Sequence, residues 1–196
     1  GTWFEVEPGT NPGHLFQQNT MRDAMVAALS LNIFHKYTKR IKMANIAQVV
    51  NVLQSMILTK DDQMVLTPTY HVFHMYKVHQ DAEFIPVKTV ASSPVPTEYG
   101  NVPALSVSAS RKNGVMHVSL VNPLLDKSQT VTLDWDSFDA DANISGVILK
   151  AKDVHDYNDF GKEVKVANKA FTGFSKNPKA VVVELPAASV VTLEIK

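Results

Sequence analysis

Two carboxylates stand close together near the start of the chain, where the first ten residues read GTWFEVEPGT. Glu5 and Glu7 are two positions apart, so both side chains lie on one side of an extended segment. Glycosidases use paired carboxylates, about 5–5.5 Å apart in retaining enzymes and about 6.5–9.5 Å apart in inverting enzymes. Such a pair must flank the bond that is cut, whereas neighbours on one strand approach a sugar from one side. We therefore interpret Glu5 and Glu7 as solvated loop carboxylates rather than as a catalytic pair.

Histidines offer a second kind of chemistry. His71 and His74 lie three residues apart, and on one helix face this is a possible metal-ligand spacing. No Asp, Glu or Cys shares that face nearby and the neighbours are aromatic, so packing or surface roles are favoured and no metal site is assigned. The chain contains no cysteine, which removes thiolate chemistry and disulfides from consideration. Neither G-x-S-x-G nor a nucleotide-binding glycine motif is present, and we predict no cofactor.

Amide side chains recur at every third residue of an otherwise apolar run, at Asn45, Gln48, Asn51 and Gln54. Buried amides need hydrogen-bond partners. At the C-terminal mouth of a parallel barrel they would suit sugar hydroxyls. The alternative, given equal weight, is that they cap local backbone or pack between helices. Trp3 poses a similar choice between a stacking platform for a sugar ring and a core residue, and its local sequence alone favours the core.

The elements that must position these residues change in character near residue 82. Residues 3–6 predict a short strand, and residues 21–36 predict a helix that begins with a capping box at Thr20. The β-branched residues at 49–53 predict a buried strand of a parallel sheet. Residues 58–63 predict a polar turn, and Thr67-Pro68 predicts the start of a second helix. Two strand–helix units cannot close a barrel, so residues 1–80 are expected to be the end of a larger α/β domain. The apolar side chains expected to lack partners are Met21, Leu29, Ile46, Val50 and Phe73.

After residue 82 the sequence predicts strands only. Leu105, Val107 and Ala109 alternate with polar residues, Asn113-Gly114 marks a hairpin turn, and residues 115–121 form the returning strand. Further short strands at 128–135, 144–151, 179–186 and 189–196 indicate an antiparallel β-sandwich. The proline-containing stretch 91–103 is expected to be an irregular connection. We predict two domains, an α/β part at 1–80 and a β-sandwich at 81–196.

Charge and composition limit the class of protein. The chain has 19 basic and 19 acidic residues, so we expect no nucleic-acid partner and no membrane partner. No apolar run approaches the roughly 20 residues of a membrane-spanning helix. No signal peptide is visible. Cytoplasmic, periplasmic and secreted locations all stay open.

Long motifs in the first 80 residues resemble a known family. They read GTWFEVEPGTNPGHLFQQNTMRDA, NIFHK, KMANIAQVVNVLQS and LTPTYHVFHMY, and the chain ends in LPAASVVTLEIK. The sequence is similar to the C-terminal part of the α-L-arabinofuranosidases of glycoside hydrolase family 51. The resemblance implies an α+β multidomain fold, in which the last units of a (β/α)8 barrel precede a jelly-roll-like antiparallel sandwich. It also implies retaining hydrolysis of terminal α-L-arabinofuranosides in arabinan and arabinoxylan, without a metal or other cofactor.

The resemblance further implies which site residues the chain carries. In the family the nucleophile stands in an Asp-Glu-Trp run at the end of barrel strand 7, and Gly1-Thr2-Trp3 resembles the residues directly after that run. Both catalytic glutamates are therefore expected before Gly1, so no residue here is catalytic and the chain alone is expected to be inactive. Trp3 matches an aromatic wall beside the substrate, and Gln48 matches a substrate-binding glutamine.

The expected partners are an arabinose-containing glycan, the rest of the barrel, and further copies of the intact parent in a homo-oligomer. The alternative function is a non-catalytic glycan-binding or assembly module centred on the sandwich. Trp135 is the single aromatic candidate for sugar binding there, and we predict that it is a core residue.

Overall fold

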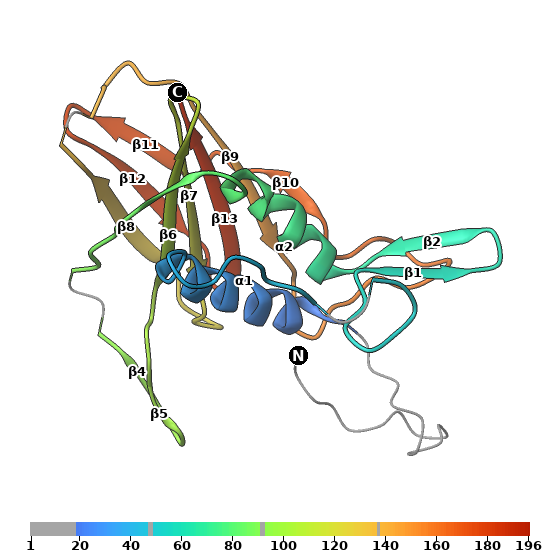
Figure 1. Ribbon diagram of the computed structural model, residues 1–196. Coiled ribbons are helices and arrows are strands. Elements are labelled where there is room, and N and C mark those ends of the chain that lie inside the picture. Colours follow the sequence, from blue (N-terminus) through green and yellow to red (C-terminus); the bar gives the residue numbers. More distant parts are fainter. Residues whose placement is uncertain (1–18, 47–48, 91–92, 137) are drawn as a thin grey trace.

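The computed structural model describes residues 19–46, 49–90, 93–136 and 138–196, which form antiparallel sheets covered by a few helices (Figure 1). The helices are α1 (Met21–Lys36), α2 (Pro68–Tyr76) and the 3-10 helix η1 (Lys77–His79). The first five strands are β1 (Ile57–Lys60), β2 (Gln63–Leu66), β3 (Glu83–Ile85), β4 (Val95–Thr97) and β5 (Gly100–Val102). The later strands are β6 (Ser106–Lys112), β7 (Val115–Asn122), β8 (Gln129–Asp134), β9 (Ile144–Lys150), β10 (Asn168–Ala170), β11 (Phe174–Asn177), β12 (Ala180–Leu185) and β13 (Ser189–Ile195).

A six-stranded sheet in the order β10-β9-β13-β7-β6-β3 forms the centre of the molecule. One face packs on the three-stranded sheet β11-β12-β8, and α1 and α2 cover the other face (Figure 1). Strand β13 shows why both faces are filled. Val191 and Leu193 enter the core between the sheets, whereas Val190 packs with the helices. The antiparallel sandwich expected from the alternating sequence is confirmed.

Local signals start the two α-helices where the sequence predicted. The backbone N–H of Thr20 donates to the Asp23 carboxylate at 2.9 Å, which closes the capping box of α1. The Thr67 hydroxyl accepts from the Tyr70 N–H at 3.4 Å at the start of α2, where Pro68 takes the first helical position. The Asn113-Gly114 turn is also confirmed, with φ angles of 52° and 80° that suit a tight hairpin.

Several sequence expectations are wrong. Residues 49–53 form no strand: Val50 makes a single parallel bridge to Ile57, and residues 49–52 are exposed. A buried parallel strand needs neighbours on both sides, and the described residues supply only the β1–β2 hairpin there. The polar turn expected at 58–63 is confirmed at residues 61 and 62, but β1 and β2 take up the residues on either side of it. The irregular stretch 91–103 contains the β4–β5 hairpin.

Met21 was expected to lack partners and is instead completely buried. The reason is that α1 lies across the six-stranded sheet, where Met21 joins a cluster with Leu149 and Val190. All pairings between the named strands are antiparallel, so the end of a parallel barrel at 1–80 stays a prediction, as does the boundary near residue 80. Among the described residues, no helix is both long enough and apolar enough to cross a membrane.

Candidate functional site

The two residues expected to touch a sugar, Trp3 and Gln48, both fall outside the described residues. Glu5 and Glu7 fall outside them as well. Their assignments therefore stay predictions, and the structure bears on the site through the residues that flank Gln48. Trp135, the aromatic candidate on the sandwich, packs against the core between the sheets with its ring edge-on to Phe138 at 4.8 Å. Trp135 is therefore partly buried against the core, which favours the packing role over a sugar platform.

Asn51, three residues after Gln48, has a structural role. Its amide nitrogen donates to the carbonyl and hydroxyl oxygens of Thr59 at 3.1 and 2.8 Å, and its amide oxygen accepts from the Thr59 N–H at 2.7 Å. Asn51 adopts a φ of 54°, a left-handed conformation that Asn tolerates better than most residues. For this amide the alternative of local backbone capping is therefore correct, and it fixes the β1–β2 hairpin to the segment that follows Gln48.

Asn45 and Gln54 lie on opposite sides of Gln48 in the sequence and meet at one open hollow of about 330 Å³. Phe34 and Val26 of α1 and Phe73 of α2 supply its apolar walls. Two amides beside apolar and aromatic walls are typical of a site that binds hydroxyl groups and the apolar face of a sugar. The structure thus brings together two of the four predicted amides on the side of α1 that faces away from the sheet.

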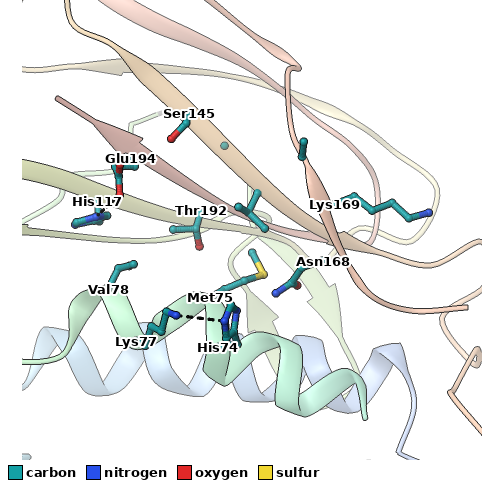
Figure 2. Close-up of a pocket in the computed structure, with 13 residues that line it drawn as sticks. His74, Met75, Lys77, Val78, His117, Ser145, Asn168, Lys169, Thr192 and Glu194 are labelled. Atoms are coloured by element: carbon teal, nitrogen blue, oxygen red, sulfur yellow. Dashed lines mark hydrogen bonds and ion pairs between the residues drawn. The ribbon is translucent and has the colours of Figure 1, made fainter. Parts of the chain in front are cut away.

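The two histidines of α2 line different hollows. Figure 2 shows His74 of α2 beside Lys77 of η1, and the Lys77 ammonium lies 3.2 Å from Nε2 of His74. His71 lines a different hollow, beside the β1–β2 hairpin. The pKa of His71 is lowered, mainly by burial and to a smaller extent by the nearby His74. Across the described parts of the chain, no three His, Cys, Asp or Glu side chains are grouped as metal ligands would be.

An open groove of about 440 Å³ lies between α2 and strands β10, β9, β13 and β7 of the six-stranded sheet. Figure 2 shows the side chains that line it. Its sheet side carries His117 and Glu194, whose Nε2 and Oε2 atoms are 3.3 Å apart. Lys196 binds the other oxygen of Glu194 at 2.6 Å, and this hydrogen bond is the main reason that the pKa of Glu194 is lowered. The carboxylate of Glu194 therefore already has partners within the chain, in Lys196 and His117.

A row of hydroxyls and imidazoles, which we call the Ser–His seam, joins the helices to the sheet. Three serine hydroxyls of β6 form hydrogen bonds with side chains of the helices. The Asn32 amide nitrogen donates to the Ser106 hydroxyl at 3.1 Å. Nδ1 of His35 lies 2.8 Å from the Ser108 hydroxyl, and Nδ1 of His79 lies 2.7 Å from the Ser110 hydroxyl. The second ring nitrogen of His79 lies 2.8 Å from the Ser119 hydroxyl of β7. The seam supplies a direction and a register for helix docking that apolar contacts alone do not provide.

Burial dominates the electrostatics of the Ser–His seam. It lowers the pKa of His79 to about 3, helped by the nearby His35 and His117. It also lowers the pKa of His35, whose ring centre is 4.8 Å from that of His79. Burial raises the pKa of the Tyr76 hydroxyl, which donates to the Asn32 side chain at 2.8 Å. Because their pKa values are lowered, both seam imidazoles are neutral near pH 7.

The Ser–His seam was not predicted from the sequence, although β6 carries a signal for it. Serines at 106, 108 and 110 alternate with Leu105, Val107 and Ala109, so one face of β6 is polar and yet buried. A fully polar buried face indicates a partner that also carries polar groups. The partners, however, come from residues 31 to 74 positions away in the chain, which local patterning does not connect.

Comparison with known proteins agrees with this architecture. The family model described as the α-L-arabinofuranosidase C-terminal domain matches residues 1–189. The chain belongs to this family. It is 52% identical over 197 residues to an intracellular exo-α-L-arabinofuranosidase of Bacteroides ovatus, covering 100% of this chain and 38% of that protein.

Solved structures show the same relationship. The family 51 arabinofuranosidase of Xanthomonas axonopodis pv. citri superposes with a TM-score of 0.90 at 44% identity, over 100% of this chain and 40% of that one. The thermostable family 51 enzyme of Thermotoga petrophila shares the fold, with a TM-score of 0.80 at 20% identity over 92% of this chain and 39% of that one. The chain thus spans about two-fifths of the length of these relatives.

Proposed function

We propose that this chain is the C-terminal part of an α-L-arabinofuranosidase that removes terminal arabinofuranosyl groups from arabinan- or arabinoxylan-type glycans. The observation that carries the proposal is the 52% identity to an exo-acting arabinofuranosidase along the whole of this chain. The relatives are more than twice as long, so we assign the activity to the longer polypeptide and not to these residues alone. Both catalytic glutamates of the retaining mechanism would come from the preceding part.

The face of α1 that points away from the sheet supports the proposal that a further part of the polypeptide packs against this chain. While Met21, Ala24 and Ala28 are completely buried against the sheet, Ile33 is more than half exposed, as is Tyr37 at the C-cap of the helix. A helix that is apolar on two faces is typical of a position between two layers. We propose that the preceding barrel residues cover this second face and complete the fold on that side.

Within the intact enzyme we propose that Gln48 hydrogen-bonds the arabinofuranosyl ring and that Trp3 forms an aromatic wall beside it. The support is the position of Gln48 between Asn45 and Gln54, which meet at one hollow, and the fixing of the next segment by Asn51. No residue of this chain is proposed to be catalytic. We also propose that the intact enzyme is a homo-oligomer, which light scattering on the parent protein would check.

The test uses the parent polypeptide, with this chain as its C-terminal part, and 4-nitrophenyl α-L-arabinofuranoside as substrate. We expect turnover with retention of the anomeric configuration. Proton NMR of the sugar that is released first measures this configuration. Replacement Gln48→Ala should raise KM about tenfold, because a lost hydrogen bond to a sugar hydroxyl weakens binding. The matched control is Gln80→Ala, which changes an exposed glutamine just after η1 and should leave KM unchanged. Equal kinetics for both variants would remove Gln48 from the site, and a parent without turnover would refute the proposed function.

A further inference from the structure

A second cleft lies beside the segment that follows Gln48, between the β1–β2 hairpin and a loop of the sandwich. It measures about 530 Å³, and we call it the hairpin–loop cleft. One wall is strand β2 (Gln63–Leu66), the opposite wall is the loop at 158–164, and His71 of α2 lies between them. In Figure 1 this loop runs close to the hairpin, at the end of the molecule where α1 begins.

The hairpin–loop cleft is connected directly to the residues around the predicted sugar site. The N–H groups of Met56 and Ile57 both donate to the Val49 carbonyl, at 3.1 and 3.0 Å, and the Asn51 side chain binds Thr59. Residues 49–51 come immediately after Gln48. The position of the hairpin is therefore set by the same short segment that would present Gln48 to a sugar.

The far wall of the cleft is held rigidly by one buried side chain. Asn158 is 4% exposed, and its amide nitrogen donates to the Leu66 carbonyl at 2.9 Å and to the Val166 carbonyl at 2.7 Å. Its amide oxygen accepts from the Lys165 and Val166 N–H groups at 3.1 and 3.0 Å. Asn158 thereby joins the sandwich loop to the end of β2. A cleft whose walls are linked in this way is preorganised for a ligand, which lowers the entropic cost of binding.

The chemistry of the walls suits a neutral sugar. Met64 and Val164 line the cleft and are each 63% exposed, an apolar surface that fits the C–H face of a pyranose or furanose ring. The Asp159 carboxylate lies 2.7 Å from the Lys162 ammonium. Carboxylate oxygens such as those of Asp159 can accept hydrogen bonds from hydroxyls. His71 adds an imidazole that is neutral near pH 7, because its pKa is lowered, and such mixed apolar and polar walls are typical of small-molecule sites.

We propose that the hairpin–loop cleft binds main-chain sugars of the branched glycan whose arabinofuranosyl branch occupies the site at Gln48. The inference rests on the proposed function. An enzyme that releases terminal groups leaves the rest of its substrate outside the catalytic pocket, along a neighbouring surface. The sandwich loop would then contribute to the choice of polymer, although it supplies no catalytic group.

The test compares the parent enzyme with a Met64→Ala/Val164→Ala variant on substrates with and without a main chain. For an arabinose-substituted xylotetraose or a branched arabinotetraose, we expect kcat/KM to fall about tenfold through KM, because apolar contacts of this size discriminate by such factors. For 4-nitrophenyl α-L-arabinofuranoside, which has no main chain, we expect both constants to stay within about twofold. The control Val90→Ala removes a side chain that is 75% exposed elsewhere and should change neither substrate's kinetics.

The two oligosaccharides also identify the main chain that the cleft prefers, because the larger loss marks the bound polymer. Isothermal titration of unsubstituted xylotetraose and linear arabinotetraose into the parent enzyme supplies a second measurement, and the double variant should lose the binding of the preferred one. Unchanged kcat/KM on both branched substrates, or an equal loss on the aryl substrate, would overturn the inference while leaving the proposed function intact. A wild-type parent that is inactive on the aryl substrate would overturn both.

Discussion

Acid should loosen the contact between the helices and the sheet through His79. The His79 side chain is 8% exposed, and its two ring nitrogens lie 2.7 and 2.8 Å from the hydroxyls of Ser110 and Ser119. The titratable groups around it are His35, His117 and Tyr76, and no carboxylate is among the causes of its lowered pKa. Protonation would therefore place a charge in a buried site without a counter-charge.

The sign and size of the effect follow from the two pKa values of His79. In the folded chain its pKa is about 3, whereas in the unfolded chain it is about 6.5. As the pH falls below about 6.5 the unfolded state binds the proton first, so stability is lost progressively until the pH reaches the folded pKa. At pH 5 the difference is about 1.5 pH units, which corresponds to about 2 kcal/mol of unfolding free energy. The pKa of His35 is lowered too, so its contribution has the same sign.

Urea denaturation of this chain at pH 7 and pH 5, followed by circular dichroism, measures the effect. His79→Gln keeps an amide donor and acceptor but cannot titrate in this range. Between the two pH values this variant should lose about 2 kcal/mol less stability than the unmodified chain. The control His74→Gln changes an exposed histidine on α2 and should keep most of the loss, because it acts on the pKa of His71 and not on His79. If His79→Gln loses as much stability as the unmodified chain, the pH dependence does not arise at the Ser–His seam and the reasoning is refuted.

Two further predictions concern the stability of the sandwich, and urea denaturation at pH 7 checks both. Leu193 is fully buried between the sheets, so Leu193→Ala should cost about 2–5 kcal/mol through lost burial and the cavity left behind. A loss below about 1 kcal/mol would show that this core is not closely packed. Asn122 is fully buried and donates to the Lys127 and Pro186 carbonyls at 2.9 and 3.0 Å, so Asn122→Ala should cost about 1–3 kcal/mol through the loss of these hydrogen bonds. An unchanged free energy of unfolding for Asn122→Ala would mean that water takes over the hydrogen bonds of the amide.

The sandwich could be predicted from the sequence because its signals are local. Val107 and Ala109 alternate with serines, Asn113-Gly114 supplies the turn residues of a hairpin, and the strands after residue 128 are short and β-branched. The helix starts at Thr20 and Thr67 were equally visible, because capping depends on residues within one turn. All of these expectations are confirmed by the described elements.

The segment between the helices was harder to predict because its partners are not local. Residues 49–53 carry the composition of a buried strand, but strand formation needs neighbouring strands that the described residues do not provide. Asn51 illustrates the same limit. A sequence pattern cannot distinguish an amide that binds a sugar from one that binds the backbone eight residues away, and only the hydrogen bonds to Thr59 decided between them.

The family could be assigned from contiguous motifs, whereas the site could be predicted only in part. The stretch around Gln48 resembles a substrate-binding segment as a run of residues, and the family membership is now shown by the match over residues 1–189. The hairpin–loop cleft needs residues from 63–71 and 158–164 to come together. Asn158 makes that connection through the Leu66 carbonyl across 92 positions of sequence, which no short motif records.

The most direct measurement of the central claim compares this 196-residue chain with its longer parent in one assay. Both proteins would be incubated with 4-nitrophenyl α-L-arabinofuranoside, and release of 4-nitrophenol would be followed by absorbance. We predict turnover by the parent and none by this chain, although circular dichroism should show that the chain retains its β-sheet structure. Clear turnover by the chain alone would contradict the account, because it would mean that these residues contain the catalytic carboxylates that we place in the preceding part of the enzyme.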